Sequence, residues 1–124
     1  MLIKTLKNIL PSYNGKQHSD FQKLINAIPE DYSIDSNDID ILFKAFQMGL
    51  EAHKGQKRKS GEKYFNHCIE VAKQLIKWNM DLSTIISGLL HDTIEDTDIT
   101  KNDLKNTFGS DIANLVERVS KLSG

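Results

Sequence analysis

The sequence Leu-Ser-Thr-Ile-Ile-Ser-Gly-Leu-Leu-His-Asp-Thr-Ile-Glu-Asp-Thr-Asp, at residues 82–98, is the most informative stretch of the chain. Its first half places apolar side chains three and four positions apart, at Leu82, Ile85, Ile86, Leu89 and Leu90. This spacing is typical of one face of an α-helix, and the high apolar content predicts that the helix is substantially buried. The stretch then changes to one histidine and four carboxylates within eight residues. A core helix therefore leads directly into a polar cluster.

The same helical spacing recurs on both sides of this stretch. Before it, we expect helices at residues 1–10, around residues 21–28, from a cap at Ser36, Asn37 or Asp38 to about His53, and from about Tyr64 to Trp78. After it, Thr100 and Asp103 resemble a capping box that opens a helix to Phe108, and a last helix follows Gly109. Trp78 and the phenylalanines lie at helical spacing, so we expect them in the core. Because no stretch has the period of a β-strand, the sequence predicts an all-α fold.

Length, composition and charge limit the classes of protein. The chain has 124 residues, of which 39% are hydrophobic and 27% charged, and a formal net charge of −1. These values are ordinary for one soluble globular domain, and the near-neutral charge argues against a DNA-binding protein or a protein of anionic membranes. Cys68 cannot form an internal disulfide, and the first residues lack the apolar run of a signal peptide or membrane span. We therefore expect a cytoplasmic protein.

The polar cluster offers side chains that suit a divalent metal ion. Asp92 and Asp96 have a like-charge spacing that destabilises a helix, and acids near a helix C-terminus oppose its dipole. A bound cation would compensate for both effects, because His91 and Asp92 supply an imidazole and a carboxylate. His67, on the preceding predicted helix, is the natural further ligand if the two helices pack side by side. Glu95 and Asp96, one turn beyond, would orient a metal-bound water or accept its proton.

More ordinary interpretations stand beside this one. A His-Asp pair is common in proteins, and an acidic helix end is usually a solvated surface. Residues 54–63 form a glycine-containing loop with five basic side chains, which is either a solvated turn or a cationic surface for a polyphosphate. We interpret His53 as structural or surface, because a histidine cation complements a helix end, and His18 as a surface loop residue.

Several ordered motifs resemble one known family. They are His-Lys-Gly-Gln-Lys-Arg-Lys-Ser-Gly-Glu-Lys-Tyr at residues 53–64, His67, Leu-Leu-His-Asp-Thr-Ile-Glu-Asp-Thr at residues 89–97, Phe108-Gly109 and Val-Ser-Lys-Leu at residues 119–122. Over about residues 40–122 this pattern is similar to the HD-type hydrolase domain of the RelA/SpoT homologue family and of its small single-domain relatives. The resemblance implies an all-α, HD-domain helical bundle.

The resemblance also implies a metal centre and a reaction. His67, His91 and Asp92 would be the metal ligands, usually for manganese (Mn²⁺). Glu95 and Asp96 would be catalytic, because they would position or activate the attacking water. The implied reaction is hydrolysis of guanosine 3′,5′-bispyrophosphate, ppGpp or pppGpp, to GDP or GTP and pyrophosphate. This reaction turns over the alarmone of the stringent response.

The basic loop has an implied role in substrate binding. By resemblance, Arg58, Lys59 and Ser60 would bind the guanosine tetraphosphate or pentaphosphate, with Arg58 against the base. The sequence departs from the family's usual pattern at three positions near the motifs. Lys63 and Cys68 stand where proline is usual, and Ser120 stands where threonine is usual.

A further departure concerns the extent of the domain. The family completes its metal site with an aspartate and adds a nucleotide-binding asparagine, both on a helix downstream of residue 124. We therefore expect residues 1–124 to be a single HD-type hydrolase domain truncated on its C-terminal side, with an N-terminal helical extension at residues 1–36 and the core part at residues 37–124. The parent protein would then carry a C-terminal synthetase domain. Apolar surface left open on such a fragment would favour self-association.

Two other functions stay open. A catalytically inactive or regulatory HD-like module would bind guanine nucleotide or a partner protein without turnover, which the missing downstream aspartate favours. A different HD nucleotide phosphohydrolase would share His91 and Asp92, although the Arg58-Lys59-Ser60-Gly61 loop disfavours it.

Overall fold

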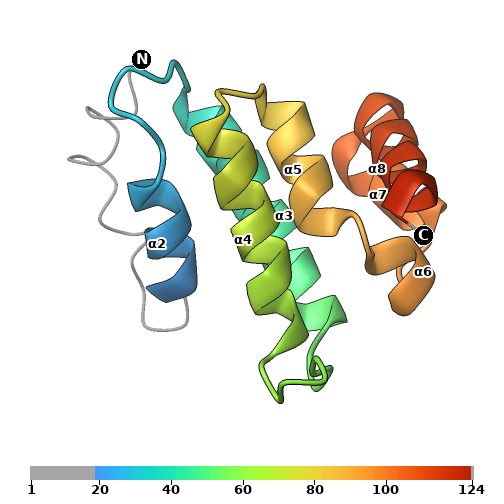
Figure 1. The fold of residues 1–124 in the computed structure, drawn as a ribbon. Helices are drawn as coiled ribbons and strands as arrows, with labels where there is room; N and C mark the ends of the chain where they lie inside the picture. Colours follow the sequence, from blue (N-terminus) through green and yellow to red (C-terminus); the bar gives the residue numbers. More distant parts are fainter. Residues whose placement is uncertain (1–18, 124) are drawn as a thin grey trace.

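The computed structural model describes residues 19–123 as a bundle of helices without a β-strand in that range. The helices are α2 (Ser19–Asn26), α3 (Ser36–Ala52), α4 (Tyr64–Lys77), α5 (Leu82–Leu90), α6 (Thr93–Asp96), α7 (Lys101–Phe108) and α8 (Ser110–Ser123) (Figure 1). The predicted all-α fold is confirmed. The helix predicted at residues 1–10, like His18, lies outside the described residues. No helix of the described range is long and apolar enough to cross a membrane.

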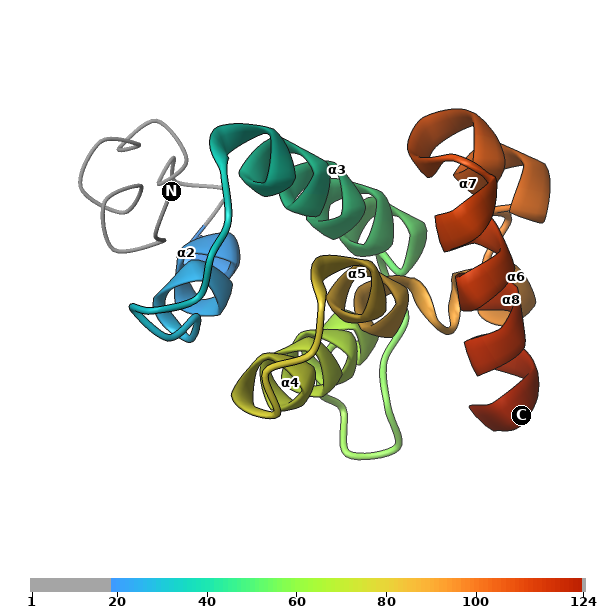
Figure 2. The same ribbon diagram turned by 90° about the horizontal axis from the view of Figure 1, so that it is seen from above.

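Helix α5 lies at the centre of the bundle. It packs on α3, α4 and α8, and the view from above shows it between these neighbours (Figure 2). All of residues 85–90 are buried, and the four large apolar side chains among them are at most 2% exposed. Burying one such side chain stabilises a fold by about 1.5–3 kcal/mol. The predicted burial of this helix is confirmed, and α5 is the apolar centre on which α3, α4 and α8 pack.

The outer helices each contribute one apolar face. Phe21 of α2 packs edge-on against Phe43 of α3, with ring centroids 4.9 Å apart, and lies 5.3 Å from the ring of Phe46. Helices α7 and α8 pack on one another, and α8 also covers α5 with Ala113 and Val116 buried. The result is one continuous core from α2 to α8.

Gly88 brings α4 and α5 close together. A Cβ atom at this position would lie 2.5 Å from Cδ1 of Leu75 and 3.4 Å from Cγ1 of Val71, both on α4. Any side chain here would require α4 to shift or its leucine to repack. The absence of a side chain thus allows the close approach of α4 to α5.

Two predictions about the ends of helices were wrong. Helix α3 is capped by Asp35, which accepts a hydrogen bond from the Asp38 backbone N–H at 2.8 Å, and the Asp38 carboxylate accepts one from the Asp35 N–H. The predicted cap at Ser36, Asn37 or Asp38 falls inside this capping box. Trp78, predicted in the core, is 62% exposed because it follows the last turn of α4. The buried face of α4 ends at Ile76.

The predicted capping box of α7 is confirmed. Thr100 Oγ1 accepts a hydrogen bond from the Asp103 N–H at 3.1 Å, and Asp103 Oδ2 accepts one from the Thr100 N–H at 2.9 Å. These bonds satisfy two backbone donors at the helix start, which would otherwise lack a partner within the helix.

We predict that Thr100→Ala lowers the free energy of unfolding by about 1 kcal/mol, because the helix loses its cap. Thr100→Ser keeps the hydroxyl and should stay within a few tenths of the parent value. Urea unfolding followed by circular dichroism measures both. An equal loss in the serine variant would show that the hydroxyl does not stabilise α7.

Candidate metal centre

The chain breaks its helix where the polar cluster begins. Helix α5 ends at Leu90, and the Thr93 hydroxyl donates a hydrogen bond to the Leu90 carbonyl at 2.7 Å. His91 and Asp92 follow outside the helix, and Asp96 lies at the end of the separate turn α6. The prediction that Asp92 and Asp96 strain one continuous helix was wrong, because α5 ends before them and Asp96 belongs to the separate turn α6. Asp92 still follows the C-terminus of α5, where its charge opposes the helix dipole. The break also turns His91 and Asp92 toward α4.

Three side chains from two parts of the fold converge at this break. His67 on α4 and the adjacent His91 and Asp92 each offer one ligand atom, and these atoms lie within 4.8 Å of one another. His91 is 7% exposed, and the side chain of Asp92 is 13% exposed. The rings of His67 and His91 have centroids 5.8 Å apart. Sequence analysis predicted that helix packing would bring these three residues together, and the structure places them so.

Hydrogen bonding fixes the orientation of His91. Its Nδ1 lies 2.7 Å from the Gly88 carbonyl oxygen, which only accepts, so Nδ1 carries a proton and donates it. Its Nε2 then faces Oδ2 of Asp92 at 2.9 Å. In the neutral imidazole, the Nε2 lone pair would point at a carboxylate oxygen. Only a second proton or a cation makes that arrangement favourable, and a backbone carbonyl behind the ring is the usual support for a metal-binding histidine. The donor set therefore fits a divalent metal ion.

Tyr64 is a residue of this site that sequence analysis did not single out. Its hydroxyl donates a hydrogen bond to Oδ2 of Asp92. Burial raises the pKa of Tyr64, and the hydrogen bond to Asp92 raises it further, so the hydroxyl remains a donor at neutral pH. Its position three residues before His67 was the available signal, because residues three apart share a face of a helix.

The surroundings of His67 favour its neutral form. Burial lowers the pKa of this histidine, and the positive charge of Arg58 lowers it further. A neutral imidazole is the form that binds metal ions, so protons compete less with a metal at this ring.

The basic loop between α3 and α4 has a defined shape. Lys57 and Lys63 face one another as an antiparallel bridge, and the Arg58 N–H donates to the Glu62 carbonyl at 2.8 Å. The Gly61 N–H closes a four-residue turn on the Arg58 carbonyl at 2.8 Å, with a φ of 88° at Gly61 that other residues rarely adopt. The loop is thus a small hairpin with Arg58, Lys59 and Ser60 exposed at its tip.

This tip borders on a hollow beside the three-residue cluster. The hollow has a volume of about 620 Å³ and is lined by Lys57, Arg58, Lys59, Ser60 and Tyr64. Tyr64 connects the hollow to the cluster, because it lines the hollow and its hydroxyl donates a hydrogen bond to Asp92. The structure therefore places the predicted substrate-binding residues next to the predicted ligands.

The two predicted catalytic carboxylates do not belong to the ligand cluster. Glu95 and Asp96 are exposed on α6, and within the described range the group of possible ligands contains neither. Their catalytic role stays a prediction. His53, interpreted as structural or surface, is 2% exposed, so the surface alternative was wrong. It lies at the end of α3, and its ring is buried against Tyr64 and Phe65 although the chain that follows is exposed.

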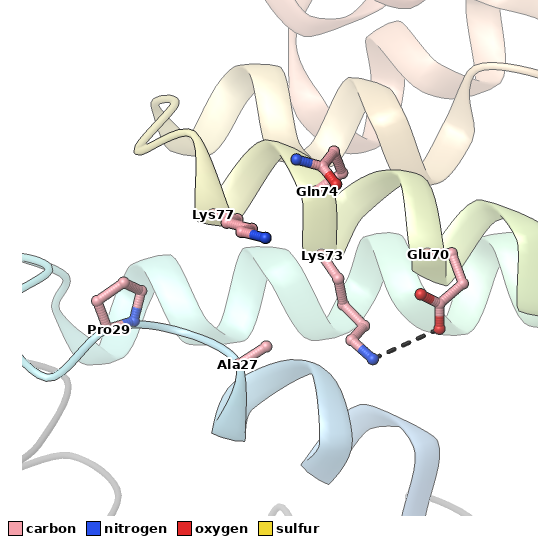
Figure 3. A pocket seen from close by; sticks show the side chains of 6 residues that line it. All are labelled: Ala27, Pro29, Glu70, Lys73, Gln74 and Lys77. Atoms are coloured by element: carbon pink, nitrogen blue, oxygen red, sulfur yellow. Dashed lines mark hydrogen bonds and ion pairs between the residues drawn. The ribbon is translucent and has the colours of Figure 1, made fainter.

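Another hollow lies away from this site. It has a volume of about 400 Å³ and is lined by Ala27, Pro29, Glu70, Lys73, Gln74 and Lys77, between the end of α2 and α4 (Figure 3). Lys73 pairs with Glu70 there at 3.4 Å. None of the predicted site residues lines this hollow.

The helical fold and the histidine and aspartate cluster define an HD domain. The profile of the family described as HD domain matches residues 45–124, and the chain belongs to this family. Within the family it is a relative of the RelA/SpoT proteins, as the resemblance of its motifs implied.

Three curated relatives illustrate this relationship. The chain is 50% identical over 86 residues to a GTP pyrophosphokinase of Myxococcus xanthus, covering 69% of the chain and 11% of that protein. It is 48% identical over 84 residues to a guanosine-3′,5′-bis(diphosphate) 3′-pyrophosphohydrolase of Vibrio cholerae, covering 68% of the chain and 12% of that protein. It is 42% identical over 101 residues to the bifunctional (p)ppGpp synthase/hydrolase SpoT of Escherichia coli, covering 82% of the chain and 14% of that protein. The chain thus spans a small part of the length of the curated relatives it matches.

A solved structure has the same fold. It is a metazoan ortholog of SpoT that hydrolyzes ppGpp, with a TM-score of 0.63 and 29% sequence identity. The match covers 71% of this chain and 50% of the metazoan chain.

We predict that Mn²⁺ raises the melting temperature of the chain, because an ion bound only by the folded state stabilises it, by about 2.7 kcal/mol at one hundred times the dissociation constant. His67→Ala and Asp92→Asn should remove most of this metal-dependent shift. Thermal unfolding at increasing Mn²⁺ concentration measures it. The control is Asp98→Asn, which removes an exposed carboxylate outside the cluster. Equal shifts in all four proteins would place the ion elsewhere.

Proposed function

We propose that this chain is a metal-dependent pyrophosphohydrolase that removes pyrophosphate from the 3′ position of ppGpp or pppGpp. One observation carries the proposal. A cluster of three ligand residues lies beside a cationic hollow, and Tyr64, which lines the hollow, donates a hydrogen bond to Asp92 of the cluster. A metal centre next to a phosphate-binding surface is the arrangement that phosphoanhydride or phosphoester hydrolysis needs. The similarity to curated pyrophosphohydrolases and to a SpoT ortholog supports the choice of substrate.

The hairpin tip binds the substrate in this proposal. Arg58 has a planar guanidinium group that can stack on a guanine base, and Lys59 offers a compact positive charge to a phosphate. Ser60 lies beside them at the exposed tip, where its hydroxyl can donate to a phosphate oxygen. Lys57 adds a third cation to the walls of the hollow.

The residues of the cluster prepare the site for hydrolysis. We propose that the ion is Mn²⁺. When bound, it would polarise a phosphate oxygen and lower the pKa of a water molecule. His67 is held neutral by burial and by Arg58, and the Gly88 carbonyl orients His91. Tyr64 donates to Asp92 and fixes its carboxylate.

In this proposal, the residues of α6 transfer the proton. Glu95 and Asp96 lie on the turn that follows the ligand pair, and we assign them to orienting the attacking water and accepting its proton. Exposure keeps both carboxylates accessible to solvent, into which the proton can pass. We propose further that the domain works in the cytoplasm, within a protein that also carries a synthetase domain, as the SpoT relative of Escherichia coli is bifunctional.

A nucleotide-binding HD domain without turnover is the second candidate. It is favoured by the absence of Glu95 and Asp96 from the group of possible ligands and by the size of that group, which is three residues within the described range. Such a domain would use the hollow beside Arg58 to bind a guanine nucleotide.

The test is pyrophosphate release from ppGpp by the purified chain with Mn²⁺. We expect His91→Ala to lower kcat by at least about a hundredfold, because it removes a ligand. Arg58→Ala should raise KM about tenfold, which corresponds to about 1.4 kcal/mol of lost binding. Lys105→Ala, which removes an exposed cation on α7, is the control and should leave both constants unchanged.

The outcomes separate the candidates. Tight nucleotide binding without pyrophosphate, and without an effect of chelators, would favour the non-catalytic domain. Metal-dependent release of phosphate from other nucleotides, with Arg58→Ala leaving substrate preference unchanged, would indicate a different HD phosphohydrolase.

A further inference from the structure

Gln56 bonds to three separate parts of the fold. It lies in the loop between α3 and α4, and its Nε2 donates to the backbone carbonyl of Asp96 at 2.7 Å, across forty positions of sequence. Its Oε1 lies 2.9 Å from Nδ1 of His53. Its own backbone carbonyl accepts the Tyr64 N–H at 3.0 Å. One side chain therefore links the end of α3 to α6, next to the residue that holds Asp92.

These contacts determine the proton position on His53. The Asp96 carbonyl only accepts hydrogen bonds, so the amide nitrogen of Gln56 must face it, and the amide oxygen must face His53. Because that oxygen also only accepts, Nδ1 of His53 carries the proton and donates it. In the neutral ring, Nε2 then carries no proton and can only accept a hydrogen bond.

The other nitrogen of His53 has no hydrogen-bond partner in the described part of the chain. The side chain is buried, with its ring 5.0 Å from that of Tyr64 and stacked on Phe65 at 6.2 Å. A buried acceptor without a partner costs free energy, whereas an apolar ring in the same aromatic surroundings would not. Stability alone therefore does not account for histidine at this position. What the imidazole adds is a directed donor to Gln56.

The element at the far end of this link needs external support. Helix α6 has four residues, and a helix that short is not stable by itself. Asp96 is its last residue, and a carbonyl at a helix end has no partner within the helix. Gln56 supplies that partner and so ties the turn to the α3–α4 loop.

We propose that His53 and Gln56 form a positioning pair that holds α6, and with it Glu95 and Asp96, at a fixed place relative to the ligand cluster. His53 orients the Gln56 amide, and Gln56 holds the Asp96 backbone. This inference rests on the proposed function, because Glu95 and Asp96 act there as the proton-transfer groups. A displacement of about 1 Å in such groups can lower a rate by about a hundredfold.

Two substitutions of His53 separate positioning from stability. His53→Phe keeps an aromatic ring but removes the donor, whereas His53→Asn keeps a donor near the place of Nδ1 but leaves a cavity. We expect His53→Phe to melt at the parent temperature or above it and to lower kcat for ppGpp at least tenfold, with KM within twofold. His53→Asn should melt at a lower temperature yet keep kcat within threefold.

Gln56 gives a second pair of variants and an independent measurement. Gln56→Met removes both side-chain bonds, and Gln47→Met, on the exposed side of α3, is the matched control. Amide hydrogen exchange followed by NMR reports on α6 directly. We expect the amides of Asp96 and Thr97 to exchange at least tenfold faster in Gln56→Met and His53→Phe, with those of α7 unchanged. Gln47→Met should match the parent chain in exchange and in turnover.

Each result decides the proposal. If kcat follows the melting temperature, so that His53→Asn is the less active variant, His53 is merely structural and the proposal is wrong. Unchanged exchange at Asp96 and Thr97 in Gln56→Met would overturn it as well. If the parent chain does not hydrolyse ppGpp, the proposed function fails, while faster exchange confined to α6 would still support the positioning of this turn by the pair.

Discussion

The burial of α5 is the constraint on which the rest of the structure depends. All of residues 85–90 are buried between α3, α4 and α8, so the helix has no freedom to move without disrupting the core. His91 and Asp92 follow immediately after α5, so the burial of α5 fixes where they lie. The partner helix α4 brings His67 to them, and the end of α3 brings His53 and the basic hairpin. The positions of the polar residues in the cluster therefore depend on the apolar packing of the helices that carry them.

Electrostatics then decides what the cluster is suited for. Two imidazole nitrogens and a carboxylate face one another in a mostly buried place, and the hydrogen bonds around them orient these groups without neutralising the carboxylate. Burial lowers the pKa of His67, and the positive charge of Arg58 in the hairpin lowers it further. A divalent ion satisfies all three groups together, which neither a proton nor a distant arginine does.

The sequence predicted most of the helices and the grouping of His67 with His91 and Asp92, because both depend on periodic apolar spacing and on the packing of consecutive helices. It did not predict the break after Leu90, which depends on the hydroxyl of Thr93 competing for a carbonyl. The bond of Tyr64 to Asp92 joins residues 28 positions apart, and only the shared face of Tyr64 and His67 on α4 pointed to it. The bond of Gln56 to Asp96 joins residues 40 positions apart from a loop, and periodicity carries no information about such a contact, which follows from the tertiary path of the loop. Trp78 lies at helical spacing but past the buried face of α4, and spacing alone could not locate that limit.

Gly88 links the geometry of the ligand cluster to the packing of the core. Its missing side chain lets α4 approach α5, where a Cβ would meet Leu75 at 2.5 Å, and His67 and His91 are carried by these same two segments. The span between the imidazoles is accordingly set in the hydrophobic interior. A larger side chain at this contact would therefore change the spacing of the cluster while every ligand side chain stays the same. In this fold, the geometry of the ligand cluster therefore depends on the packing of the interior.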